Sequence, residues 1–200
     1  MAIQGLWAGP YLREVEGLDE SAAATVVSLI GLAMVAGYAL TGVATRFLAE
    51  RGVHPVITAG AGMLAFLAVQ ALVLAHPPIP AWCLWSLYGF TGSTGVVCYA
   101  VLGASFPGHM TGRVNTALTL SVFACSFAVQ AGIGAIVALW SDAAVGHRAA
   151  WLVLMATQAV AFAWYCLPRA RAAAAEGATR SPIFKPNGRD ARGGPTTIGA

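Results

Sequence analysis

The chain has 200 residues, of which 58% are hydrophobic and only 10% are charged, and its formal net charge is +3. A soluble domain carries about 25% charged residues, so this composition leaves too little polar area for a water-exposed surface. With a mean hydropathy of +0.72, the chain is predicted to be a membrane protein whose solvent and first partner is the lipid bilayer.

The first segment, residues 1–12, is mildly apolar but too short to span a bilayer. It lacks the basic region and cleavage site of a signal peptide. We therefore interpret it as the outer end of a helix whose first part is missing, which suggests a truncated chain or a fragment. Trp7 and Tyr11, beside Pro10, are candidates for an outer gate. The alternative is a bent helix end that serves packing alone.

Five later stretches reach the roughly 20 apolar residues that a helical span needs. They are residues 22–45, 56–75, 81–106, 116–140 and 149–167. Asp19 or Ser21 is expected to cap the first of them. Their connections are short, so neighbouring helices must be antiparallel. The predicted fold is an all-α, polytopic helical bundle over residues 1–168.

Basic residues gather on one side of this predicted topology. Nine Lys or Arg residues share that side: Arg46, Arg51, Arg113, Arg169, Arg171, Arg180, Lys185, Arg189 and Arg192. The opposite side has Arg13 and Arg148, and acidic residues accompany Arg13. The positive-inside rule makes the basic side cytoplasmic. The segment 169–200, rich in Ala, Gly, Pro and Arg, is expected to be a disordered, basic cytoplasmic tail.

Two stripes of side chains could line a solute path. On a helical wheel Asn115, Thr119, Ser126 and Gln130 fall within about 60° of one another. A polar stripe at this depth should face other helices or a water-filled cavity rather than lipid. The span 81–106 has a second stripe that includes Tyr88 and Tyr99. The candidate cavity residues are therefore Tyr88, Tyr99, Asn115, Ser126 and Gln130. In both spans, helix packing alone is the alternative.

The sequence contains none of the usual signatures of an enzyme or a metal site. The four cysteines lie in apolar runs without a CxxC pair, and the four histidines are scattered. We therefore expect no catalytic activity, no cofactor, no metal and no nucleic-acid partner. No Asp, Glu, Lys or Arg lies deep in a predicted span, so any proton-coupling group must sit elsewhere or transport is not proton-driven.

Three segments resemble the C-terminal half of bacterial major facilitator superfamily transporters. The segment "GVATRFLAERGVHPV" (42–56) is similar to the loop motif G-x-x-x-D-R-x-G-R-R, with Gly42 at the first Gly and Arg51 at the last Arg. It departs from that motif elsewhere, and Arg46 stands at the Asp position. "FPGHMTGRVNTAL" (106–118) is similar to the loop between helices ten and eleven, through Gly112 and Arg113. "QGLWAGPYLREVEGLDES" (4–21) is similar to the end of helix seven and the start of helix eight.

The resemblance implies that the five spans are helices eight to twelve of a multi-pass protein of the bacterial inner membrane. It also implies a secondary transporter that moves a small solute by alternating access between two six-helix halves. The partner would then be the missing N-terminal half or a second copy. In the cytoplasmic loops, Gly42, Arg46, Arg51, Gly112 and Arg113 would help to gate the site. The alternative is an accessory or scaffold membrane protein that transports nothing, or the remnant of a decaying gene.

Overall fold

The computed structural model describes the backbone of residues 3–179 and the side chains of residues 5–168 except Ala104. In this part of the chain the backbone is helical, with short connections and no strand, as the sequence predicts. A π-helical turn, Ile3–Trp7, leads into α1 (Ala8–Glu14). The other α-helices are α2 (Glu20–Glu50), α3 (Pro55–Ala75), α4 (Ala81–Gly92), α5 (Val97–Ala104), α6 (Thr111–Val137) and α7 (Ala143–Thr179). Short 3₁₀ segments, Ser93–Val96 and Gly108–Met110, precede α5 and α6.

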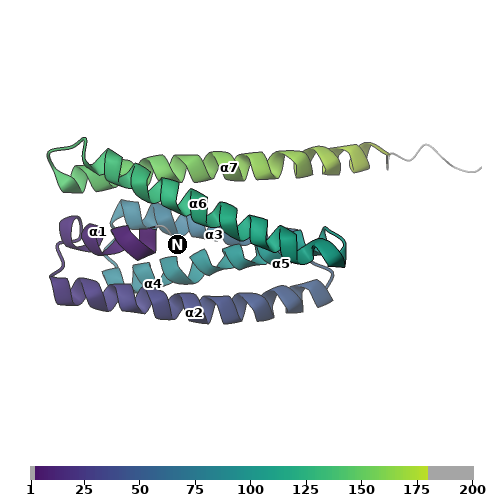
Figure 1. Ribbon diagram of the computed structural model, residues 1–200, viewed down its shortest axis with the longest axis horizontal. Coiled ribbons are helices and arrows are strands. Elements are labelled where there is room, and N and C mark those ends of the chain that lie inside the picture. The colour runs from purple at the N-terminus through teal and green to yellow at the C-terminus, as the bar shows by residue number, and fades with distance from the viewer. Residues whose placement is uncertain (1–2, 180–200) are drawn as a thin grey trace, which may run out of the picture. The chain divides into compact units, whose positions relative to one another are not determined.

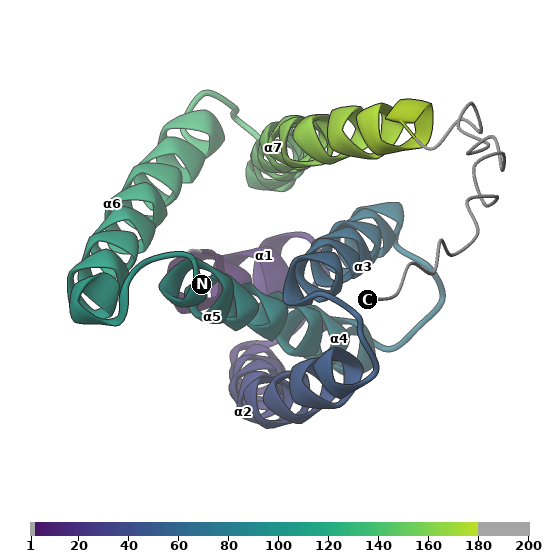
Figure 2. The same cartoon turned by 90° about the vertical axis from the view of Figure 1, so that its right-hand side faces the viewer.

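The chain divides into two compact units within α7, Met1–Ala163 and Trp164–Ala200. All contacts described below lie in the first unit. There, successive long helices run in opposite directions (Figure 1). Seen along the helices, α2, α3, α6 and the first part of α7 lie around α1 and the α4–α5 helix (Figure 2).

Within the described residues, four helices are long and apolar enough to cross a membrane. They are Glu20–Glu50, Pro55–Ala75, Gly108–Val137 and Ala143–Pro168. The fifth expected span, 81–106, corresponds to α4, the 3₁₀ segment Ser93–Val96 and α5, which follow one another along the bundle (Figure 1). We call these three pieces together the interrupted helix.

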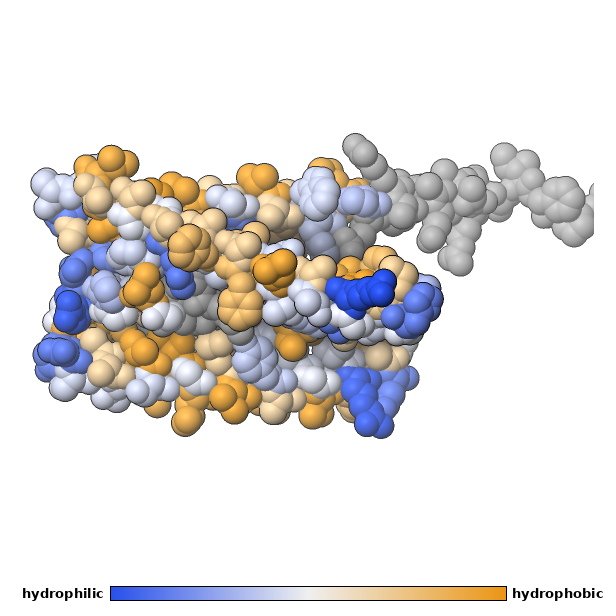
Figure 3. All heavy atoms as spheres, in the orientation of Figure 1, coloured by the Kyte–Doolittle hydropathy of each residue, from blue (hydrophilic) through white to orange (hydrophobic). Residues whose placement is uncertain are grey.

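Charged side chains gather at the two ends of the bundle, and apolar ones cover the surface between them (Figure 3). Among the described residues, the end that holds the connections 15–19, 76–80 and 138–142 has an excess of acidic groups: Glu14, Glu16, Asp19, Glu20 and Asp142 against Arg13 and Arg148. The end that holds residues 51–54 and 105–110 has Arg46, Arg51 and Arg113 against Glu50. We call these the acidic end and the basic end.

Hydroxyl side chains explain why the α-helix changes to a 3₁₀ helix at Ser93. Thr91, Ser93 and Thr94 each donate to a carbonyl three or four residues earlier, at 2.8, 2.6 and 2.8 Å respectively. Such bonds compete with the backbone ladder and bend helices. Glycines on both sides of Ser93 lower the helix propensity further. The backbone nevertheless stays right-handed and helical through Gly92, Ser93, Val96 and Val97.

The interrupted helix is packed tightly against α2 and α3 at glycines. A Cβ atom at Gly37 of α2 would lie 2.7 Å from the Phe90 carbonyl oxygen, and one at Gly89 would lie 2.6 Å from the Ile30 carbonyl oxygen. A Cβ atom at Gly62 of α3 would lie 2.6 Å from Thr94 Cβ. Small residues that let two backbones approach this closely are typical of helix contacts in membranes.

Two boundaries differ from those expected. α7 continues to Thr179, whereas the sequence indicated a disordered tail from residue 169. The reason is the alanine-rich run after Pro168, because alanine has the highest helix propensity and extends a helix beyond its apolar part. Residues 180–200, the remainder of that expected tail, lie outside the described residues. α6 begins at Thr111 rather than near residue 116, which places Arg113 in its first turn.

The first prediction concerns the glycine contact between α2 and α4. Gly37→Ala should lower the stability of the purified protein by about 1–3 kcal/mol, because the new methyl group overlaps the backbone of α4. The matched control is Gly31→Ala on the same helix, where a Cβ atom meets nothing within 4 Å. The control gains the same helix propensity without the clash. Thermal unfolding in detergent measures both, and equal stability of the two variants would contradict the contact.

The second prediction concerns the cap of α2. Asp19 Oδ1 accepts hydrogen bonds from the Ala22 N–H at 2.7 Å and the Ser21 hydroxyl at 2.8 Å. The bond from Ala22, followed by that from Ser21, lowers the pKa of Asp19 below its ordinary value of 3.8. A lowered pKa means that this contribution to stability is complete above pH 3.8 and is lost as the pH falls through the pKa of the folded state.

Asp19→Asn should therefore lose less stability than the wild type when the pH falls from 6 to 3. Thermal unfolding across this range provides the measurement, with Glu20→Gln as the control at the neighbouring position. If Asp19→Asn keeps the full acid dependence of the wild type, the charged cap has no role in it.

Candidate functional site

A cavity of about 530 Å³ lies between α2, the interrupted helix and α6. Its lining residues are Tyr38, Gly92, Gly95, Val96, Tyr99, Val122 and Phe123. Each of them lies well inside its span, away from both charged ends. Ligand sites for small molecules have volumes of this order and mainly apolar walls with a few polar groups. We call it the mid-helix cavity.

The local sequence opens this cavity at the 3₁₀ segment. Gly92 and Gly95 present backbone instead of side chains, and a Cβ atom at Gly95 would meet nothing within 4 Å. Rings enter from three helices: Tyr38 from α2, Tyr99 from α5 and Phe123 from α6. Val96, Val122 and Phe123 are 39%, 36% and 67% exposed. The cavity is therefore open on one side rather than enclosed.

Polar groups extend from the cavity along the contact between α5 and α6. The Thr119 hydroxyl donates to the Tyr99 hydroxyl at 3.4 Å. One turn earlier on α6, Asn115 Oδ1 is buried without a hydrogen-bond partner. It packs near Gly103 of α5, where a Cβ atom would lie 3.8 Å from that oxygen. A buried acceptor without a partner is costly unless water or a ligand reaches it.

The structure brings together some of the predicted cavity residues and separates others. Tyr99 lines the cavity, whereas Asn115 is outside the lining and packs near Gly103. Ser126 is about one turn beyond Phe123 on α6 and is not part of the lining. Gln130 is further along, and its backbone carbonyl accepts a hydrogen bond from Trp7. Tyr38 and Phe123 line the cavity but were missed, because neither belongs to a polar stripe.

Tyr88 belongs to a buried aromatic cluster instead of the cavity. It is 2% exposed, and its ring lies 5.5 Å from Trp85 and 5.7 Å from Trp151, between centroids. Tyr11 joins the same cluster, 5.4 Å from Trp85 and 5.2 Å from Trp151. Tilted rings at these separations add to the energy of burial. The cluster therefore attaches α1 to both α4 and α7.

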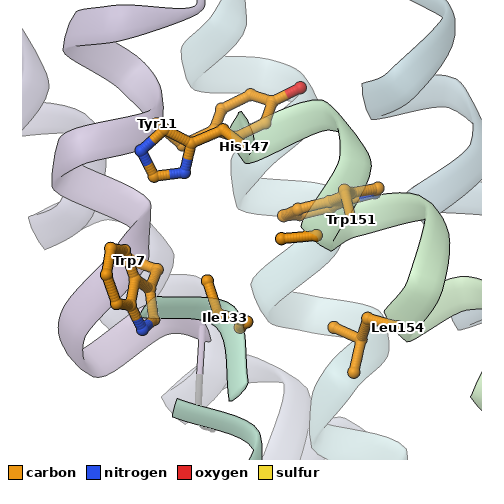
Figure 4. A pocket seen from close by; sticks show the side chains of 7 residues that line it. Trp7, Tyr11, Ile133, His147, Trp151 and Leu154 are labelled. Carbon is orange, nitrogen blue, oxygen red and sulfur yellow. The ribbon is translucent and has the colours of Figure 1, made fainter. Parts of the chain in front are cut away.

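Trp7 and Tyr11, the outer-gate candidates, hold the N-terminal segment inside the bundle. Trp7 Nε1 donates to the Gln130 carbonyl of α6 at 3.1 Å, and Tyr11 is 1% exposed. Between them and α7 lies a small space of about 10 Å³, with His147, Trp151, Ile133 and Leu154 around it (Figure 4). This is room for about one water molecule.

Two glutamates, Glu14 at the end of α1 and Glu16 just after it, contact histidines from other parts of the chain. Glu14 Oε2 lies 2.9 Å from His147 Nε2 on α7, and Glu16 Oε2 lies 3.4 Å from His76 Nδ1 at the end of α3. The His147 side chain is 3% exposed, whereas that of His76 is 30% exposed. Periodicity and motifs do not predict these pairs, because the two members of each are far apart in the chain.

The residues expected to act in cytoplasmic gating lie at the basic end, where the contacts are local. Arg46 Nε bonds Glu50 Oε1 at 3.0 Å within α2, and both side chains are exposed. The Arg51 guanidinium stacks on Phe47, 3.6 Å from the ring centroid. Gly42 has open space beside it, and Gly112 and Arg113 form the first turn of α6. Exposed pairs of this kind contribute at most about 1 kcal/mol.

The described residues contain no group of three or more His, Cys, Asp or Glu side chains that could hold a metal ion. The cysteines Cys83, Cys98, Cys125 and Cys166 are free. Comparison of the chain with protein-family models, with curated proteins and with solved structures finds no match.

The third prediction compares the two carboxylate–histidine pairs. In a double-mutant cycle with Glu14→Gln and His147→Ala, the coupling energy should be about 1–3 kcal/mol, because a buried imidazole bonds a charged group. The cycle with Glu16→Gln and His76→Ala should give less than about 1 kcal/mol, because its contact is longer and its imidazole is more exposed than that of His147. Unfolding free energies in mixed micelles measure both. Equal coupling in the two cycles would contradict the assigned geometry.

Proposed function

We propose that this chain forms one half of a secondary transporter of the major facilitator type, and that the mid-helix cavity is part of the path of a small solute. The observation that carries the proposal is the position of the cavity in the middle of α2, the interrupted helix and α6. Secondary transporters bind their substrates near the bilayer midplane, commonly beside discontinuous helices. The 3₁₀ segment Ser93–Val96 is a milder irregularity at the same depth, and a 3₁₀ stretch within a long helix often marks a functional hinge.

In this proposal the interrupted helix is a fifth span. Its three pieces have 12, 4 and 8 residues and follow one another, which is long enough for a hydrocarbon core of roughly 30 Å. The basic end is then cytoplasmic by the positive-inside rule, and the acidic end is outside. The helices α2, α3, the interrupted helix, α6 and α7 correspond to helices eight to twelve, in a bacterial inner membrane.

The open side of the cavity supports a second, facing half. Phe123 and the neighbouring Val122 of α6 are exposed there. A facing bundle would close the cavity over them and provide alternating access as the two halves move against each other. Another part of a longer polypeptide, a partner chain or a second copy could supply it. Arg46, Arg51 and Arg113 would then contact that half at the basic end, with Gly42 and Gly112 beside them.

The fourth prediction tests solute access to the cavity. The four native cysteines are replaced by serine, and a single cysteine is placed at Val122, which lines the cavity, or at Leu120, which is 70% exposed outside it. An impermeant thiol reagent is added to membranes that contain the protein. Val122→Cys should react about tenfold faster or more, because a thiolate forms in water and not in lipid.

Equally slow reaction at both positions would contradict a solute path. It would favour a membrane scaffold, in which α2, the interrupted helix and α6 are packed for stability and their open side faces lipid. Serine replacement at all four native positions must first leave thermal unfolding unchanged, which tests that the background is folded.

A further inference from the structure

The chemistry of the mid-helix cavity restricts what can bind there. The cavity is lined by three rings, two valines and two glycines, and no Asp, Glu, Lys, Arg or His is among the lining residues. The hydroxyl groups of Tyr38 and Tyr99 are its polar side-chain atoms, and Thr119 already donates to that of Tyr99. Such a wall offers ring faces and two phenolic donors.

An anion would lack a partner in this cavity. Arg46, Arg51 and Arg113 are near the basic end, and Arg13 and Arg148 are near the acidic end. A carboxylate or phosphate loses its hydration when it moves to mid-membrane. Without a cation at hydrogen-bond distance, no interaction in the cavity compensates for that loss. A sugar fits poorly for a related reason, because its many hydroxyls would greatly outnumber the polar groups of the wall.

A flat, apolar ring system fits the wall. The backbone at Gly92 and Gly95 leaves a bare surface, and Tyr38, Tyr99 and Phe123 approach from three different helices, so a ring can stack on one side chain while it contacts the others. A single positive charge is tolerated, because ring faces attract cations even without a carboxylate. The volume of about 530 Å³ is in the range for a drug-sized molecule.

We infer that the mid-helix cavity binds aromatic, apolar molecules that are neutral or carry one positive charge, and that it rejects their anionic analogues. This inference rests on the proposed function, since it assigns a substrate class to the same cavity. The donors at Tyr38 and Tyr99 orient an acceptor atom on the ring system. Selection between aromatic molecules then depends on shape and charge rather than on a dense hydrogen-bond pattern.

The test uses three dyes, two of which have the same rings and different charge. N-phenylnaphthylamine is neutral, and anilinonaphthalene sulfonate is its anionic analogue; ethidium provides the cation. Binding is measured by fluorescence with the full chain in nanodiscs of zwitterionic lipid, and the signal of empty discs is subtracted. The neutral dye and ethidium should each bind at least about tenfold more tightly than the sulfonate, because the negative charge of the sulfonate finds no cation in the cavity.

A matched pair of variants locates the site. Gly95→Leu fills the cavity at a position with open space, so it should reduce binding of the neutral dye about tenfold without a change in thermal unfolding. Gly31→Leu, also in open space but outside the lining, should bind like the wild type. Equal or tighter binding of the sulfonate, or undiminished binding by Gly95→Leu, would overturn the inference.

The outcome is separate from that of the thiol experiment. If Val122→Cys is accessible to water but no aromatic dye binds, the solute path stands and the assigned class is wrong. If aromatic dyes bind at the Gly95 site while Val122→Cys stays unreactive, the ligand class stands and the solute path is wrong.

Discussion

The close approach of α2 to the interrupted helix positions both the 3₁₀ segment and the cavity beside it. It is made at Gly37 and Gly89, where each helix places a glycine against the backbone of the other. In a membrane there is little hydrophobic force between helices, so such contacts rely on dispersion over well-matched surfaces. The buried hydroxyl of Ser93 lies beside Gly37 in this contact. It donates to the Phe90 carbonyl and lies 3.5 Å from the Thr41 hydroxyl. The glycine contact between α2 and the interrupted helix therefore ends where the 3₁₀ segment begins. The cavity is lined by the residues around that segment.

The N-terminal segment provides the second organising contact. Tyr11 places one ring among Trp85, Tyr88 and Trp151, and Trp7 reaches the backbone of α6. Across the cluster, Trp151 Nε1 donates to the carbonyl of Gln70 at 3.2 Å, and the side chain of Gln70 bonds Gln158. These polar bonds join α3 to α7 in a region where water does not compete. These rings and amides therefore join α1, α3, α4 and α7, and none of them is among the lining residues of the cavity.

Much of the fold follows from sequence, but the cavity does not. Apolar length and short connections give the helices and their antiparallel order, and Asp19 is one of the two residues that the sequence offers as the cap of α2. Tyr88 and Tyr99 lie on one face of an ideal helix, yet one is in the core and the other lines the cavity. Each residue of a 3₁₀ helix turns the chain by about 120° around the helix axis, against about 100° in an α-helix. The four residues Ser93–Val96 therefore rotate the side chains of α5 by about 80° relative to those of α4. That rotation depends on the side-chain hydrogen bonds of Ser93 and Thr94 to backbone carbonyls, which a helical wheel does not include. The contacts of Glu14 with His147 and of Glu16 with His76 join distant segments, which periodicity does not reveal.

We propose that the interrupted helix crosses the membrane with the cavity beside its middle. The most direct test determines on which side its two flanking connections lie. Single cysteines at Ile79 and at His109, both exposed, are placed in the cysteine-free chain and treated with an impermeant maleimide in intact and in permeabilised cells. If the interrupted helix crosses the membrane, Ile79→Cys reacts in intact cells and His109→Cys reacts only after permeabilisation. Reaction of both from the same side would mean that residues 81–104 do not cross, and the cavity would then not lie in a membrane path.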